Sequence, residues 1–146
     1  MKKLLAITAA AAVMAMAGTA MAATADLQVN ATVSQVCTMT GGALNFGELD
    51  PTNPVAVSKN SESVTVTCTN GTSYTITSND GINASGTQKR LASGSNYIPY
   101  AITLPSTASG TGAAQSVTIT GTIAASAYTT SPAGTYADTV VLTVSP

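Results

Sequence analysis

Residues 61–69 read SESVTVTCT, a run in which polar and apolar side chains alternate. Successive side chains of a β-strand point to opposite faces, so the two valines and the cysteine of this run share one face. Asn70-Gly71 follows, and residues 73–77, SYTIT, alternate again. Asn-Gly is a dipeptide that tight β-hairpin turns favour. The stretch from 61 to 77 therefore predicts two antiparallel strands that pair as a hairpin.

Three later runs, residues 97–104, 116–123 and 136–144, also have the composition of strands. Pro99 predicts an edge position or a bulge, because proline cannot donate to a strand ladder. Gly121 predicts a bulge or a close approach of backbone. Residues 108–114 are small and predict a loop. The last run points four apolar side chains one way, namely Tyr136, Val140, Leu142 and Val144.

Short strands separated by turn residues predict an all-β fold, an antiparallel β-sandwich. The body from Cys37 onward supplies about six strands, whereas an immunoglobulin-like sandwich needs about seven. The run ending at Val144 has no later strand to pair with, so Val140, Leu142 and Val144 are expected on an open edge. Proteins normally cover such an edge, because it invites pairing with other chains. The expected fold is an incomplete immunoglobulin-like sandwich that lacks its last strand.

A further alternating run, residues 26–34 or DLQVNATVS, precedes the body. Its apolar residues share one face, namely Leu27, Val29, Ala31 and Val33. Either this strand folds back onto its own domain, or it completes a neighbouring copy by strand addition.

The first residues predict the compartment. A positive start, an apolar stretch over residues 4–17 and small residues before Ala23 predict a secretory signal peptide, residues 1–22. Secretion permits disulfides, and Cys37 and Cys68 allow one intramolecular pairing, which we expect to be structural. The expected domains are the signal peptide, an N-terminal strand at 23–34 and a sandwich at 35–146.

Charge and composition exclude several function classes. Residues 23–146 contain three basic and six acidic residues without a basic run, so nucleic acid is not expected as a partner. The chain has no histidine, which rules out Ser-His-Asp and Cys-His catalysis. Two cysteines do not fill a tetrahedral metal site, and no metal, cofactor or catalytic residue is expected. Glu48 and Asp50 form the only close carboxylate pair, and solvated loop charges or turn formation explain them better than catalysis.

Asp138 lies on the apolar face of the last run, either as a buried hydrogen-bonding carboxylate or at a wetter strand start. The five tyrosines are interpreted mainly as core residues: Tyr74, Tyr97, Tyr100, Tyr128 and Tyr136. A sugar-stacking surface is the alternative, and it would make the chain a monomeric carbohydrate-binding module.

Several short motifs occur in a fixed order along the chain. They are Cys37, Leu44-Asn45-Phe46-Gly47, Asp50-Pro51, residues 64–71, residues 74–76, Arg90-Leu91, Tyr100, residues 115–119 and residues 134–144. In this order, and with the signal peptide and the cysteine pair, the chain resembles the spore coat protein U family, which includes the pilins of archaic chaperone–usher pili.

The resemblance implies a non-enzymatic subunit of an extracellular pilus that serves surface attachment and biofilm formation. A periplasmic chaperone would lend each subunit a strand. An outer-membrane usher would then exchange it for the N-terminal strand of the next copy or of a related pilin. Leu27, Val29, Ala31 and Val33 would be the donor residues, and Val140, Leu142 and Val144 the edge of the acceptor groove. Spore or cell-coat material is a further reading with the same assembly.

Overall fold

The computed structural model describes residues 21–146. The predicted signal peptide lies outside these residues except for its last two. The described part of the chain forms short β-strands and one 3-10 helix, η1 (Ala125–Ala127). The strands are β1 (Cys37–Thr40), β2 (Val57–Asn60), β3 (Thr65–Cys68), β4 (Ser73–Ser78), β5 (Arg90–Ser93), β6 (Asn96–Pro99), β7 (Ala101–Thr103), β8 (Ala108–Ser109), β9 (Ala114–Ser116), β10 (Thr120–Ile123) and β11 (Leu142–Ser145).

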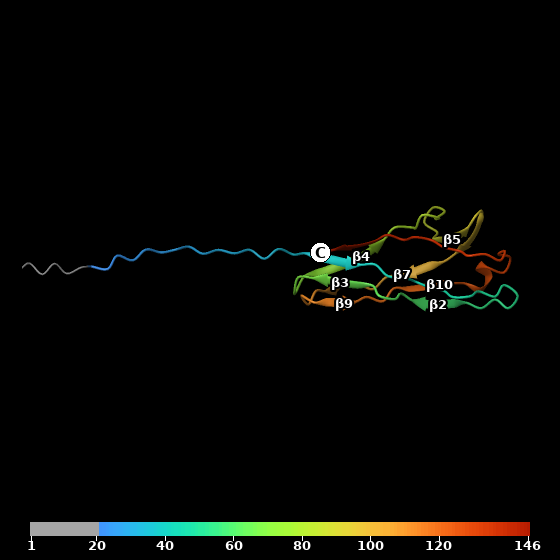
Figure 1. The fold of residues 1–146 in the computed structure, drawn as a ribbon, viewed down its shortest axis with the longest axis horizontal. Coiled ribbons are helices and arrows are strands. Elements are labelled where there is room, and N and C mark those ends of the chain that lie inside the picture. Colours follow the sequence, from blue (N-terminus) through green and yellow to red (C-terminus); the bar gives the residue numbers. More distant parts are fainter. Residues whose placement is uncertain (1–20) are drawn as a thin grey trace, which may run out of the picture. The chain divides into compact units, whose positions relative to one another are not determined.

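One layer of the body has the strand order A-B-E-D of an immunoglobulin sandwich. β3 pairs with β1 and β9, while β10 pairs with β2 and β7, and all of these pairs are antiparallel. β2 and β3 are successive pieces of strand B, and β9 and β10 are successive pieces of strand E. Figure 1 shows β3 and β9 side by side at one end of the body and β2 and β10 at the other. Strand B is interrupted at Ser63, whose φ of 59° cannot continue a strand.

The other layer contains the counterparts of strands C and F. β4 pairs antiparallel with β11 and with β8, and β5 and β6 form a separate hairpin. β4 and β5 lie on the opposite side of the body from β2 and β9 (Figure 1). Within residues 21–146 no strand pairs with the other edge of β11, the place of the seventh immunoglobulin strand. The predicted incomplete all-β sandwich is confirmed.

Two apolar clusters fill the space between the layers. The first is built from Val64, Val66, Cys68, Tyr74, Ile76, Val117 and Ile119. The second is built from Phe46, Ile98, Tyr100, Ile123 and Tyr128. The predicted disulfide joins Cys37 to Cys68 across directly opposite positions of β1 and β3. It therefore ties the first strand of the body to the centre of the first cluster.

The predicted hairpin between residues 61–69 and 73–77 is wrong. β3 and β4 belong to different layers, and the chain crosses from one to the other through a turn closed by a 3.0 Å bond from Thr72 N to Thr69 O. The favoured hairpin turn for Asn-Gly needs positive φ at both positions, and here only Gly71 has it, at 78°. The apolar faces of the two runs therefore meet across the core.

Two other predicted segments differ in detail. The run 97–104 is divided at Tyr100, because β6 pairs with β5 whereas β7 pairs with β10. Pro99 accordingly ends an edge strand, one of the two alternatives expected for it. The predicted loop 108–114 contains β8 and the first residue of β9.

Residues 21–36 have no regular secondary structure. The side chains of Leu27, Val29 and Val33 are more than four-fifths exposed. Ser34 marks the start of attachment, since its carbonyl accepts a 3.1 Å hydrogen bond from Thr69 Oγ1. Among the described residues no helix has the length and apolar character needed to cross a bilayer.

Candidate strand-acceptor groove

An open groove of about 980 Å³ runs along the body between residues 42–51 and residues 131–142. Its floor is formed by core side chains: Val64, Ile98, Tyr100, Ile102, Ile119 and Tyr128. Its two walls add further apolar side chains: Leu44, Phe46, Leu49, Tyr136, Val140 and Leu142. The groove therefore exposes part of the core that a seventh strand would cover.

The 136–142 wall has hydrogen bonds along one side. Side chains alternate between half-buried and exposed from 136 to 144, the period of an extended strand. Thr139 O accepts from Ile82 N at 3.1 Å, and Val141 O accepts from Asn79 N at 3.0 Å. Ala137 exchanges two backbone bonds with Ala92, at 2.9 and 3.0 Å. The odd-numbered residues of this wall are therefore the ones joined to the rest of their layer.

The even-numbered residues of the same wall present free backbone groups. In an extended strand the N–H and C=O groups of successive residues point to opposite sides. Within residues 21–146 the backbone groups of Asp138 and Val140 have no hydrogen-bond partner. These groups point away from the bonded side of the wall. The wall is thus an unsatisfied strand edge beside an apolar groove.

Within residues 21–146, most of the 42–51 wall also lacks backbone hydrogen bonds to a neighbouring strand. Ala43 exchanges backbone hydrogen bonds of 2.8 and 3.2 Å with Glu62. In the described part of the chain, no backbone hydrogen bond involves residues 44–49. Leu44 and Phe46 rest directly on Gly121, where a Cβ would collide with both side chains. Gly121 therefore has neither the bulge nor the backbone approach predicted for it: it pairs in register within β10, and the atoms closest to it belong to side chains.

A carboxylate lies in the 136–142 wall, on the inward face. Asp138 Oδ1 accepts hydrogen bonds from the backbone N and the Nδ2 of Asn83, both at 3.1 Å. Its Oδ2 accepts a 2.7 Å bond from the hydroxyl of Tyr100 on the floor. Gly81 packs against the same carboxylate with φ at +87°, so no side chain fits there. Of the two readings predicted for Asp138, the hydrogen bonds match the first, although the residue is half-buried rather than buried.

The surroundings of Tyr100 change the pKa of its hydroxyl. Burial raises the pKa of its hydroxyl, and the hydrogen bond to Asp138 raises that pKa further. Both effects disfavour a phenolate beside an existing carboxylate. The hydroxyl is therefore a fixed donor at neutral pH.

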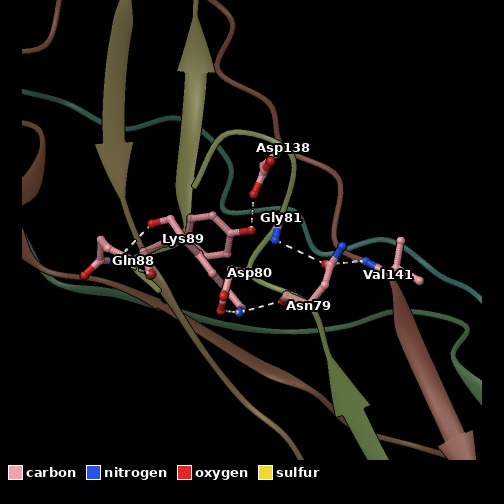
Figure 2. Close-up of polar contacts among 8 residues, drawn as sticks. Asn79, Asp80, Gly81, Gln88, Lys89, Asp138 and Val141 are labelled. Atoms are coloured by element: carbon pink, nitrogen blue, oxygen red, sulfur yellow. Dashed lines mark hydrogen bonds and ion pairs between the residues drawn. The ribbon is translucent and has the colours of Figure 1, made fainter. Parts of the chain in front are cut away.

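The loop between β4 and β5 also forms hydrogen bonds with the later end of the 136–142 wall. Asn79 Oδ1 accepts from Gly81 N at 3.1 Å and from Val141 N at 2.9 Å (Figure 2). Lys89 Nζ donates to Asn79 O at 2.8 Å and lies 3.4 Å from Asp80 Oδ1. The Lys89 side chain is only 11% exposed, so its charge is held inside the loop. Hydrogen bonds with this loop therefore hold the 136–142 wall in place.

The predicted site residues fall in different places. Val140 and Leu142 line the groove, whereas Val144 packs against the first core cluster beyond its end. The four predicted donor residues, Leu27, Val29, Ala31 and Val33, are exposed. Sequence reasoning assigned no role to the 42–51 wall. The alternation of Leu44, Asn45 and Phe46 is the signal that could have found it.

Asp50 and the tyrosines are the other residues that the sequence singled out. Asp50 Oδ1 accepts from Thr52 N and Oγ1 at 2.8 and 2.7 Å, and the side-chain bond from Thr52 lowers the Asp50 pKa. Asp50 therefore closes a turn, as its sequence context predicted. Residues 21–146 hold no group of three potential metal ligands. Tyr74, Tyr100 and Tyr128 are buried core residues, as predicted. Tyr97 departs from this prediction: it is 43% exposed, and the Arg90 guanidinium lies 4.0 Å from the centre of its ring.

Comparison with known proteins supports the same family as the sequence motifs. The family model described as Spore Coat Protein U domain matches residues 23–105, which include the N-terminal segment and β1 to β7. No curated protein sequence matches the chain.

Among solved structures, the chain is similar to a chain in the crystal structure of the CsuC–CsuE chaperone–tip adhesion subunit pre-assembly complex from archaic chaperone-usher Csu pili of Acinetobacter baumannii. The identity is 27% and the TM-score 0.49, over 77% of this chain and 40% of the other. The match thus covers less than half of the length of that chain. Because the family model covers more than half of the sequence, the protein belongs to the Spore Coat Protein U domain family.

Proposed function

We propose that the protein is a structural subunit of an extracellular pilus or fibre that polymerises by strand donation. The groove of one copy receives residues 27–33 of the next copy, or of a related pilin. The observation that carries the proposal is the unpaired backbone of Asp138 and Val140 beside an open apolar groove. A strand added there satisfies both the backbone groups and the exposed core.

The donor segment fits the wall in length and chemistry. Residues 27–33 and residues 136–142 are equally long. Apolar and polar side chains alternate along residues 27–33, and half-buried and exposed side chains alternate along residues 136–142. Burying Leu27, Val29 and Val33 contributes roughly 1.5–3 kcal/mol for each side chain. Each main-chain hydrogen bond adds about 0.5–1.5 kcal/mol and fixes the strand direction. These gains are absent while the segment stays exposed.

The same edge explains the expected partners. An uncovered strand edge in an oxidising, crowded compartment leads to uncontrolled pairing. A periplasmic chaperone that lends a strand would prevent this, and an outer-membrane usher would exchange that strand for the next subunit. Family membership and the predicted signal peptide support secretion through the periplasm to the cell surface. The role is structural rather than catalytic, in attachment and biofilm formation.

Deletion of residues 23–33 tests the proposal, because Ser34 and the body are retained. The truncated subunit should still be held by its chaperone yet form no fibres in electron micrographs after release. A synthetic peptide of residues 23–34 should bind the truncated subunit. A matched peptide of the same composition, with its apolar residues grouped instead of alternating, should not. Fibres of normal appearance from the truncated subunit would overturn the proposal.

A further inference from the structure

The groove contains one feature that does not suit an apolar strand, the Asp138 carboxylate. It lies on the inward face, between Tyr136 and Val140, where neighbouring lining side chains are apolar or aromatic. Both of its oxygens already accept hydrogen bonds, from Asn83 and Tyr100. A large apolar side chain pressed against it would remove its remaining water without offering a hydrogen bond. The incoming strand must therefore present a small residue at this point.

The wall also restricts which donor residues face it. Because the free backbone groups belong to Asp138 and Val140, these two residues form the hydrogen-bonded pairs with an added strand. Directly opposite residues place their side chains on the same face. The odd-numbered donor residues, which are apolar, must therefore lie opposite the even-numbered wall residues.

Two alignments overlap the donor segment and the wall completely. The antiparallel alignment gives the pairs Leu27–Leu142, Val29–Val140, Ala31–Asp138 and Val33–Tyr136. The parallel alignment instead brings Val29 against Asp138. Ala31 is the smallest side chain of the donor face. Only the antiparallel alignment places it at the carboxylate and leaves the larger side chains on apolar neighbours.

We infer that Asp138 determines the register and direction of the donated strand by accepting only a small side chain, Ala31, opposite it. This inference rests on the proposed strand donation and specifies the pairing within that site. A shift of two residues in either direction brings Val29 or Val33 to the carboxylate. Asp138 thus acts as a specificity residue, which selects among donors of similar apolar pattern.

Disulfide cross-linking between pairs of introduced cysteines tests the register directly. Each full-length secreted chain carries Val140→Cys together with Leu27→Cys, Val29→Cys or Ala31→Cys. Hydrogen-bonded antiparallel pairs lie about 5.5 Å apart at Cα, within disulfide range. The Val29→Cys chain should form a covalent polymer ladder on a non-reducing gel, about tenfold more abundant than with the other two. Peptide mapping identifies the linked pair.

The outcomes of this experiment distinguish a wrong register from a wrong function. A dominant ladder with Ala31→Cys means a parallel or slipped strand, and one with Leu27→Cys means the opposite slip. Either result overturns the inference and leaves strand donation standing. Fibres without any cross-link also overturn the inference. The absence of both fibres and cross-links in all three chains, and in the unmodified protein, overturns the proposed function itself.

A second test enlarges a donor side chain and leaves the wall residues unchanged. Ala31→Leu should lower fibre yield about tenfold, because the side chain meets Asp138. Val29→Leu, a smaller enlargement opposite Val140, should lower the yield far less. Chaperone-held subunits of both variants should unfold at the wild-type temperature, since the donor residues are exposed before assembly. Equal yields from the two variants would overturn the inference.

Discussion

The hydroxyl of Tyr100 donates a 2.7 Å hydrogen bond to Oδ2 of Asp138, and this bond joins the groove's floor to its wall. Asp138 is otherwise held by Asn83, in the loop that follows β4. The wall position is therefore set by contacts between segments far apart in the sequence.

Tyr100→Phe should lower the free energy of unfolding by about 1–2 kcal/mol at neutral pH, because a hydrogen bond to a carboxylate is lost. The pH dependence should change as well. Burial and Asp138 raise the pKa of Tyr100 above its ordinary value near 10 in the folded protein. The stabilisation is complete below pH about 10 and is lost as the pH rises above it, since only the unfolded chain ionises readily.

Chemical denaturation between pH about 9 and 11 checks this expectation. The wild-type subunit, held by its chaperone, should lose more stability over this range than Tyr100→Phe does. Identical slopes for the two proteins would contradict it.

Val29→Asp should prevent assembly without harming the subunit. The change places a carboxylate in the neighbour's apolar groove, where an unpaired charge is costly to bury. Gln28→Asp is the matched control, because its side chain points to the other face of the strand. Polymer formation on a gel should fall at least about tenfold for Val29→Asp and little for Gln28→Asp.

Thermal unfolding of the chaperone–subunit complex completes that comparison. The complexes of both variants should unfold at the same temperature as the wild-type complex, because residue 29 is exposed in the unassembled protein. A subunit destabilised by Val29→Asp alone would mean that the strand covers its own domain.

Replacing Cys37 and Cys68 by serine should destabilise the chaperone-held subunit by about 3–4 kcal/mol, the value for a closed loop of this length. The sequence separation of the two residues is 31. The yield of exported protein should fall accordingly. Mass spectrometry of the wild-type subunit should find no free thiol, and two free thiols in folded exported protein would contradict the assignment.

The alternation of side chains predicted the faces of several strands, but β1, β2 and β5 lie outside the predicted runs and residues 26–34 form no strand. Residues 61–69 and 73–77 bury the side chains that their period assigns to the core, and residues 136–144 half-bury theirs. This works because the period of two is a local property of an extended backbone. The missing seventh strand followed from the number of such runs, and the disulfide from the presence of two cysteines in a secreted chain.

Tertiary structure decided which strands pair and what the groove contains. Asn70-Gly71 permits either a hairpin or a crossing between layers, and burial of Thr72 between the layers accompanies the crossing. Asp138 meets Asn83 and Tyr100, which lie 55 and 38 positions away, so its hydrogen bonds are invisible to local patterns. The sequence by itself determined which side chains of a run share a face, because this depends on neighbours along the chain. Pairing, the second wall and the carboxylate depend on neighbours in space.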